Sequence, residues 1–188
     1  MKNTTKILGA IMLVAAFSTG AFSQNVEAEL TARANVLNAL TITMDQDVDF
    51  KMISATTPGV VRINPDGTGS YIGQGATSGK LTISGAQDSQ VLITYPSGVY
   101  LIGNERYNSL AYSMHVFGSV ENNVEESLEM TYEGNPAIDL LRNLSSTDGK
   151  YYLFVGGSLG GSIGNPEPLT NQAVGEYTGS VTFEVRYN

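Results

Sequence analysis

The chain of 188 residues has no cysteine, no tryptophan and a single histidine. Without cysteine it can form neither a disulfide framework nor the lipid-modified cysteine of bacterial lipoproteins. One histidine alone cannot make a zinc site unless carboxylates supply the other ligands. Without tryptophan a sugar-stacking site has weak support, although ten tyrosines are present. These absences predict a protein with no metal and no cofactor, stabilised by packing alone.

Positive charge is also scarce. The sequence has 10 lysines and arginines against 18 aspartates and glutamates, which gives a formal net charge of −8. A surface this acidic repels nucleic-acid phosphates and anionic lipid headgroups. We therefore expect neither nucleic acid nor a membrane surface among the partners of the protein.

Long apolar runs are rare as well. The one clear run, Ile7 to Phe17, follows two lysines and precedes small residues that end at Ser23. It is shorter than the roughly 20 residues that a membrane-spanning helix needs. The pattern predicts a secretory signal over residues 1–23. The mature chain, residues 24–188, is then expected to reach the periplasm, the cell surface or the extracellular medium, with no membrane insertion after cleavage.

Apolar residues instead recur with a period of two. From Val26 to Met44 every even position is apolar except Asn38, and the odd positions from Asn25 to Asn35 are polar. This alternation predicts a strand, or two strands in line, with one buried face and one hydrated face.

Further strands are predicted along the rest of the chain, separated by turn sequences such as Asn64-Pro65-Asp66-Gly67. The mature chain is long enough for one domain, and we predict an all-β fold, a single immunoglobulin-like or pilin-like β-sandwich over residues 24–188. At most one short helix is expected, starting at Asn135-Pro136 and continuing to Leu144. The predicted strands are Val60 to Asn64, Lys80 to Ser84, Gln90 to Tyr95, Tyr107 to Val120, Ser127 to Tyr132, Tyr151 to Gly156 and Glu176 to Tyr187.

The last predicted strand has the most regular alternation, and we expect it to be a core strand. Gly175 lies fourteenth from the end, Tyr187 is penultimate, and the segment resembles the C-terminal signature of chaperone-usher pilin subunits. The resemblance implies that an assembly chaperone docks on this strand, where a partner strand adds main-chain hydrogen bonds and its side chains fill a groove. The candidate assembly residues here are Gly175, Tyr177, Gly179, Val181, Phe183, Val185 and Tyr187.

A second resemblance covers most of the chain, from about Val36 to Asn188. Segments such as Asp47-Val48-Asp49-Phe50, Val155-Gly156-Gly157-Ser158-Leu159 and Gln172 to Gly179 are similar to an uncharacterised family of exported bacterial domains. That family is regarded as fimbria-related and has no assigned activity. The resemblance implies a fold and no reaction.

The N-terminal alternation has two interpretations. In pilins an N-terminal extension completes the fold of the neighbouring subunit, and residues 25–36 alternate as such a donor strand does, which makes Val26, Ala28, Leu30 and Ala32 assembly candidates. The alanines are small for a donor strand, because each missing buried CH₂ forfeits about 0.8 kcal/mol, and the pilin disulfide is absent. The alternative is that these residues form the first strand of the protein's own sheet.

Some motifs suggest chemistry but lack their context. Two G-x-S-x-G sequences, centred on Ser158 and Ser162, match the nucleophile elbow of hydrolases. The elbow requires a strand-to-helix turn with a later histidine, whereas the only histidine, His115, comes earlier. We expect a strand end and a glycine loop there, and a structural role for His115.

Two acidic groups also lack the context of a functional site. Asp45, Asp47 and Asp49 form D-x-D-x-D, the start of a calcium loop, but Phe50 replaces the required glycine. We expect a solvated acidic edge with the three carboxylates on one face. A carboxylate pair for glycoside cleavage is defined by distance, which the sequence does not supply for Glu121, Glu125, Glu126 and Glu129.

Together these patterns predict a non-enzymatic exported structural or interaction protein, a fimbrial-subunit-like component that associates by β-strand addition. Its expected partners are other copies of itself or related subunits, and a periplasmic chaperone. The first alternative is a self-contained exported sandwich that binds a glycan, calcium or a surface protein. A hydrolase is the third class.

Overall fold

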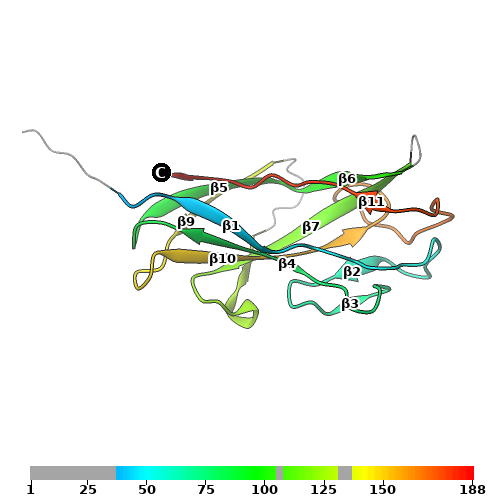
Figure 1. Ribbon diagram of the computed structural model, residues 1–188, viewed down its shortest axis with the longest axis horizontal. Coiled ribbons are helices and arrows are strands. Elements are labelled where there is room, and N and C mark those ends of the chain that lie inside the picture. Colours follow the sequence, from blue (N-terminus) through cyan, green and yellow to red (C-terminus); the bar gives the residue numbers. More distant parts are fainter. Residues whose placement is uncertain (1–36, 105–107, 131–136) are drawn as a thin grey trace, which may run out of the picture. The chain divides into compact units, whose positions relative to one another are not determined.

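The computed structural model describes residues 37–104, 108–130 and 137–188, within a compact unit that extends from Val36 to Asn188. The predicted signal, residues 1–23, and the N-terminal strand candidates Val26, Ala28, Leu30 and Ala32 lie outside the described residues. Nearly all regular structure in this unit is β, arranged as two antiparallel sheets (Figure 1). The all-β sandwich predicted from the sequence is confirmed.

The larger sheet has nine strands, and its edges are β1 and β11. Three short strands extend it beside this path: β2 pairs with the end of β10, β3 pairs with β2, and β8 pairs with β7. The strands in the main path, in spatial order, are β1 (Thr41–Gln46), β4 (Gly79–Ser84), β10 (Lys150–Leu159), β7 (Ser109–Ser119), β6 (Gly98–Gly103) and β11 (Tyr177–Thr178). The three additional strands are β2 (Val61–Ile63), β3 (Gly69–Ser70) and β8 (Leu128–Glu129).

The smaller sheet has the order β12 (Glu184–Tyr187), β5 (Gln90–Pro96) and β9 (Ala137–Asn143). The chain crosses from the smaller to the larger sheet at Ser97, directly between β5 and β6. The C-terminal residues make the reverse crossing beside it, because β11 pairs with β6 and β12 pairs with β5. Strands that switch sheets in this way form the corner of a sandwich.

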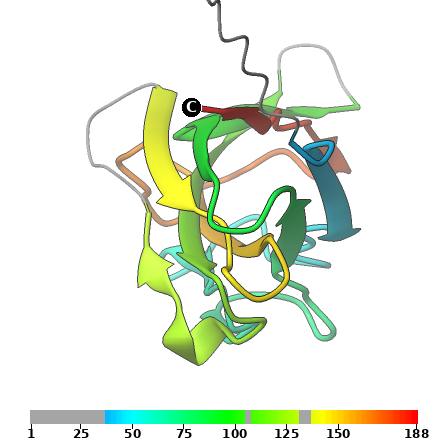
Figure 2. The same cartoon turned by 90° about the vertical axis from the view of Figure 1, so that its left-hand side faces the viewer.

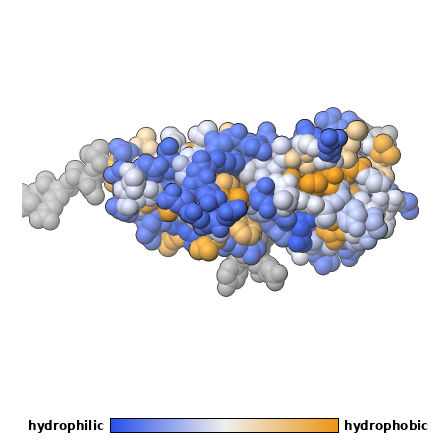
Figure 3. Space-filling view, turned by 90° about the horizontal axis from the view of Figure 1, so that it is seen from below, coloured by the Kyte–Doolittle hydropathy of each residue, from blue (hydrophilic) through white to orange (hydrophobic). Residues whose placement is uncertain are grey.

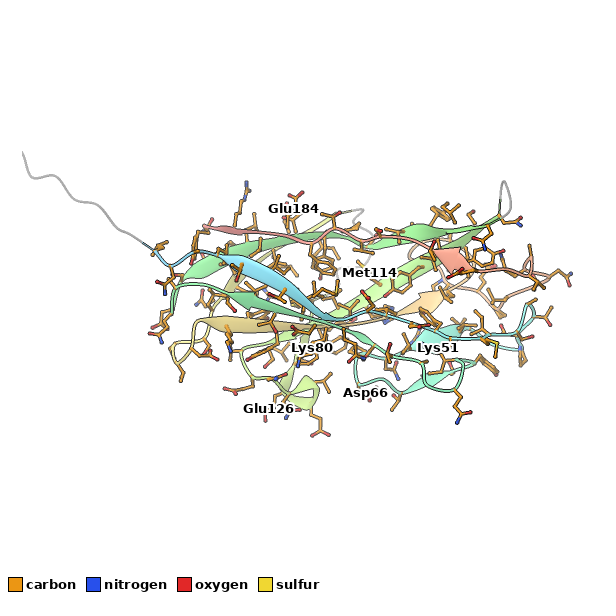
Figure 4. The ribbon with its side chains drawn as sticks, in the orientation of Figure 1. Lys51, Asp66, Lys80, Met114, Glu126 and Glu184 are labelled. Atoms are coloured by element: carbon orange, nitrogen blue, oxygen red, sulfur yellow. The ribbon has the colours of Figure 1, made fainter. Side chains whose placement is uncertain are left out.

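The core lies between the two sheets and is apolar. Strands β4 and β5 alternate buried and partly buried residues, as their period-two sequences predict. Ile83 and Leu153 of the larger sheet and Val91 and Ile93 of the smaller sheet are all fully buried. Each such side chain contributes about 1.5–3 kcal/mol on leaving water. Figure 2 shows the strands around this common interior, and Figure 4 shows Met114 of β7 within it.

The predicted short helix is wrong for residues 138–143, which belong to strand β9. Ile138 and Leu140 point to the core while Asp139 is exposed, and β5 pairs with all seven residues of β9. Pairing with a distant strand therefore overrides the local helix-starting signal. The one helical element of the described residues is a 3-10 turn, Val124–Glu126, capped by Asn123.

The C-terminal prediction also needs correction, because the segment is not an uninterrupted core strand. It forms two short strands, β11 and β12, each at the edge of its sheet. Thr178 pairs with Ile102 and Glu184 with Thr94, so the five residues 179–183 face the seven residues 95–101. The C-terminal segment crosses the corner with fewer residues than β5 and β6 do. Its middle residues, 179–183, therefore pair with no strand.

Candidate functional site

A long groove separates the two edges of the sandwich. One wall is the end of β1 and the residues that follow it as far as Ala55, and the other wall is the C-terminal segment from Gln172 to Phe183. The groove has a volume of about 1360 Å³. Figure 1 shows the two walls as the blue-to-cyan and red segments, with β7 visible between them.

The floor of the groove is the apolar core itself. Inner side chains of the larger sheet line it, including the nearly buried Met114 and Leu110. A smaller hollow of about 290 Å³ continues the groove beside Met44 and Phe183. Most of the floor side chains are buried, and Val99 and Leu101 are partly exposed. The floor residues are Leu81, Val99, Leu101, Leu110, Tyr112, Met114, Val155 and Leu159.

Hydrogen bonds join the two walls at both ends of the groove. At one end the amide of Gln172 donates to the carbonyl of Ala55, at 2.9 Å. At the other end the hydroxyl of Tyr187 donates to the carbonyl of Asn38 at 2.7 Å and accepts from the amide of Ala86 at 2.7 Å. The first contact joins the two walls directly, and the second joins residues that lie beyond the other end of the groove.

The C-terminal wall turns alternate side chains into the molecule. Phe183 stacks on Tyr95 with ring centroids 5.1 Å apart, and Val181 packs against the core. The hydroxyl of Tyr177 accepts from Gln172 Nε2 and donates to the carbonyl of Ala173, both at 2.8 Å. The outward positions between them are exposed. This alternation is the one that the sequence predicts.

The structure places five of the C-terminal candidate residues along the groove and two beyond it. Val185 and Tyr187 belong to β12 and pack against the core at the closed end. The residues on the groove are Gly175, Tyr177, Gly179, Val181 and Phe183.

Sequence reasoning missed the second wall. Met44 is 51% exposed and Met52 is 93% exposed, although both are large and apolar. Both line the groove. Met44 is the last residue on the face of the N-terminal alternation that was predicted to be buried. Its exposure indicates that this edge of the sheet is open.

The main chain of the C-terminal wall is incompletely paired. Residues 179–183 belong to no strand, and no backbone hydrogen bond joins them to another described residue. Their amides and carbonyls lie beside the groove between β11 and β12. Unpaired main-chain groups along a sheet edge form a template for another strand.

The predicted acidic edge is only partly correct. Asp45 lies where the register of β1 shifts, and its carboxylate accepts from Thr82 Oγ1 at 2.6 Å. Asp49 lies beyond β1 and accepts from both the amide and Nζ of Lys51, and the Lys51 side-chain bond is the main cause that lowers the pKa of Asp49. The three aspartates therefore do not share one face of a regular strand. Within the described residues no group of three acidic or histidine side chains is arranged to hold a metal ion.

The first G-x-S-x-G sequence is part of strand β10, not a loop. Ser158 is fully buried, and its hydroxyl oxygen accepts from Arg62 Nε at 3.2 Å. The strand continues to Leu159 because β2 and β7 pair with it on both sides. The second sequence forms a tight turn in which Ser162 pairs with Asn165. No helix follows either serine in the described chain, whereas a nucleophile elbow is a strand-to-helix turn.

His115 lies on β7, and its side chain is half-buried. Burial is the main cause that lowers its pKa, and the nearby charge of Arg62 lowers it further, while Glu129 raises it. The imidazole is thus held neutral at pH 7. Glu125 and Glu126 belong to the 3-10 turn, where the Asn123 side chain binds the amide of one and the carboxylate of the other.

The surface away from the groove is mixed. Figure 3 shows one face on which apolar residues gather in separate patches among hydrophilic ones. Figure 4 places the charged side chains of Asp66, Glu126 and Glu184 at the outside of the fold. Among the described residues there is no helix with the length and apolar character needed to cross a bilayer.

Comparison with known proteins gives one match. A family model described as a domain of unknown function (DUF4402) matches residues 40–187, which span both sheets and both walls of the groove. No curated protein and no solved structure matches the chain.

Proposed function

The chain belongs to the DUF4402 family of domains of unknown function, and we propose that it is an exported, non-enzymatic structural protein that assembles by accepting a β-strand into its groove. The observation that carries the proposal is the groove between two sheet edges, which apolar side chains line. One of those edges, the C-terminal wall, also has five unpaired residues.

A β-strand is the occupant that meets both needs of the groove. Its alternate side chains cover the apolar floor, and its main chain pairs with the free amides and carbonyls of residues 179–183. A compact apolar ligand covers the floor but leaves the wall unpaired. A sheet edge left open also promotes aggregation, so a dedicated partner strand protects the protein.

The N-terminal alternating segment gives an estimate of the free energy that a strand gains when it binds in the groove. Its six inward-facing side chains, from Val26 to Val36, carry thirteen carbon atoms. At about 0.8 kcal/mol per buried carbon group, their burial contributes about 10 kcal/mol. Association costs about 4–15 kcal/mol. The free energy gained by burying these apolar side chains is therefore similar to the cost of association. The main-chain hydrogen bonds then determine the affinity.

The sequence supports the cellular setting of this proposal. Residues 1–23 have the pattern of a secretory signal, and the C-terminal segment resembles the chaperone-binding strand of pilin subunits. We therefore place the protein as a fimbrial-subunit-like component in the periplasm, at the cell surface or outside the cell. Its partners are other copies or related subunits, with a periplasmic chaperone before assembly.

The test compares two residues in the mature chain, residues 24–188. Val181 lines the groove and packs against the core, whereas Thr170 is exposed and lines neither hollow. Light scattering after size exclusion, and gels of unheated samples in detergent, should show polymers that grow with protein concentration. Val181→Asp should abolish them, and Thr170→Asp should leave them unchanged.

Folding of both variants is checked by circular dichroism before association is compared. If Val181→Asp does not fold, Val181→Thr, which keeps the shape and adds a buried hydroxyl, replaces it. A native chain that stays monomeric at every concentration, with or without these substitutions, contradicts the proposal.

A further inference from the structure

The mature chain carries its sulfur in methionine alone. The sequence has six methionines and no cysteine, and two of the six lie in the predicted signal, residues 1–23, so four remain. These four divide into two pairs of opposite exposure. Met114 and Met130 are each 2% exposed. Met44 is 51% exposed and Met52 is 93% exposed, so both are open to reagents that the core excludes.

Both exposed methionines lie on the same wall of the groove, the one formed by the end of β1 and the residues after it. Resting on the proposed function, we propose that Met44 is an oxidation site, at which hydrogen peroxide converts an apolar groove-lining thioether into a polar sulfoxide and thereby blocks association. Met52 is oxidised as well, but its oxidation leaves association unchanged.

The reaction transfers one oxygen atom to sulfur. A lone pair of the thioether sulfur attacks one oxygen of hydrogen peroxide, and the O–O bond breaks. The second oxygen leaves as hydroxide and takes the proton of the transferred oxygen to become water. The sulfur loses two electrons and the peroxide accepts them. No thiol of the chain competes for the oxidant, and the product replaces a flexible apolar side chain by a polar one.

Met44 lies where added polarity weakens binding in the groove. It belongs to β1 opposite Leu81, and it lines both the main groove and the smaller hollow beside Phe183. A strand in the groove covers this side chain, and a sulfoxide oxygen that is covered without a hydrogen-bond donor loses its hydration. Oxidation of Met44 should therefore weaken association by about tenfold or more.

Met52 provides a control within the same wall. The loop that carries it is fixed by the hydrogen bond from the amide of Gly73 to the carbonyl of Phe50, at 2.9 Å. The main chain is closely packed there, because a Cβ atom at Gly73 would lie 2.7 Å from the amide nitrogen of Met52. The Met52 side chain nevertheless remains almost entirely in solvent. Its sulfoxide stays hydrated, so its oxidation should not affect association.

The two buried methionines are protected while the protein is folded. Met114 lies on β7 in the floor of the groove, and the sulfur of Met130 accepts a hydrogen bond from the hydroxyl of Tyr151 at 3.7 Å. Both side chains have almost no contact with solvent. Oxidation of the folded chain is therefore confined to Met44 and Met52, and a loss of association does not arise from a damaged core.

The test treats the mature chain, residues 24–188, with dilute hydrogen peroxide. Peptide mapping by mass spectrometry locates the added oxygen atoms, and light scattering measures polymer formation. Met52 should be oxidised first, and polymers should be lost only as Met44 gains its oxygen. Met114 and Met130 should stay unmodified, and circular dichroism should show the same fold before and after treatment.

Leucine replacements separate the two sites, because leucine is close to methionine in volume and has no sulfur to oxidise. Met44→Leu should assemble like the native chain and should continue to assemble after peroxide treatment. Met52→Leu should lose assembly on treatment, as the native chain does. Methionine sulfoxide reductases for both sulfoxide epimers, with dithiothreitol as reductant, should restore assembly. Dithiothreitol alone should not, because the chain has no disulfide.

Two further measurements do not depend on the oxidised monomer. Met44→Gln places a polar side chain of similar length at the site without any oxidant, and it should weaken association as the sulfoxide does. Polymers formed before peroxide is added should show Met44 unmodified and Met52 oxidised, because a strand in the groove covers Met44.

The outcomes separate this inference from the proposed function. If the native chain polymerises and continues to do so with Met44 fully oxidised, the inference fails while the proposed function stands. Loss of polymers while Met44 is still unmodified, or equal protection by Met44→Leu and Met52→Leu, also overturns the inference alone. A native chain that never polymerises overturns both.

Discussion

The hydroxyl of Tyr187 offers the sharpest test of how the sandwich is closed at the end of the groove. It donates to the carbonyl of Asn38 and accepts from the amide of Ala86, both at 2.7 Å. It thus connects β12 to Asn38, which precedes β1, and to Ala86, which follows β4 and Gly85. Tyr187→Phe removes this one oxygen and keeps the ring that packs against the core.

The expected loss follows from the exposure of the two partners. A hydrogen bond contributes about 0.5–1.5 kcal/mol net. Asn38 is exposed, so water replaces the hydroxyl at its carbonyl, whereas Ala86 is half-buried and its amide loses a partner. We expect Tyr187→Phe to lower the free energy of unfolding by about 1–2 kcal/mol. In a domain of this size the melting temperature should fall by about 2–8 °C.

Thermal and urea unfolding followed by circular dichroism measure this loss, at a concentration where size exclusion shows one species. Tyr100→Phe is the matched control, because Tyr100 is 51% exposed and its hydroxyl has no partner among the described residues. Its stability should stay within about 0.5 kcal/mol of the native value. Equal stability of the two variants would refute the closing role of Tyr187.

Two further predictions concern the core and pH. Gly118→Ala places a methyl group against Met130 Sδ and 2.6 Å from Tyr151 Oη, so it should lower the free energy of unfolding in urea by about 1–3 kcal/mol. Gly175→Ala is the control and should not lower it, because the space around Gly175 is open. Burial lowers the pKa of His115, so the unfolded chain binds a proton more readily than the folded chain, and the free energy of unfolding should fall as pH drops below about 6.5. His115→Gln should make this free energy less dependent on pH between pH 7 and 5. An unchanged slope would exclude His115 as the source of the pH dependence.

The strands with strict alternation could be predicted from the sequence alone. Residues 80–84 and 90–95 correspond to β4 and β5, and residues 107–120 contain β7. Side-chain alternation is a local property, because successive residues of a strand point to opposite faces whatever their partners are. Burial alternates along β4 and β5 in the same way, whereas β7 has five buried residues in succession, Leu110 to Met114.

Elements whose pairing is distant could not be predicted. Residues 138–143 resembled a helix start until β5 paired with them, and β6 was not expected at all. Strand β10 extends past Gly156 because two other strands hold its end. In each case local propensity is weak, and a neighbour far away in the sequence decides the structure.

The same division applies to the groove. The sequence by itself determined the side chains of the C-terminal wall, with Tyr177, Val181 and Phe183 on one face, because that face depends only on the period of two. Only the tertiary structure showed that this wall is an open edge, since strand order places β1 and β11 at opposite ends of one sheet. The unpaired residues 179–183 arise because five residues cross a corner that takes seven in the neighbouring strand, a mismatch that exists only once both sheets are assembled.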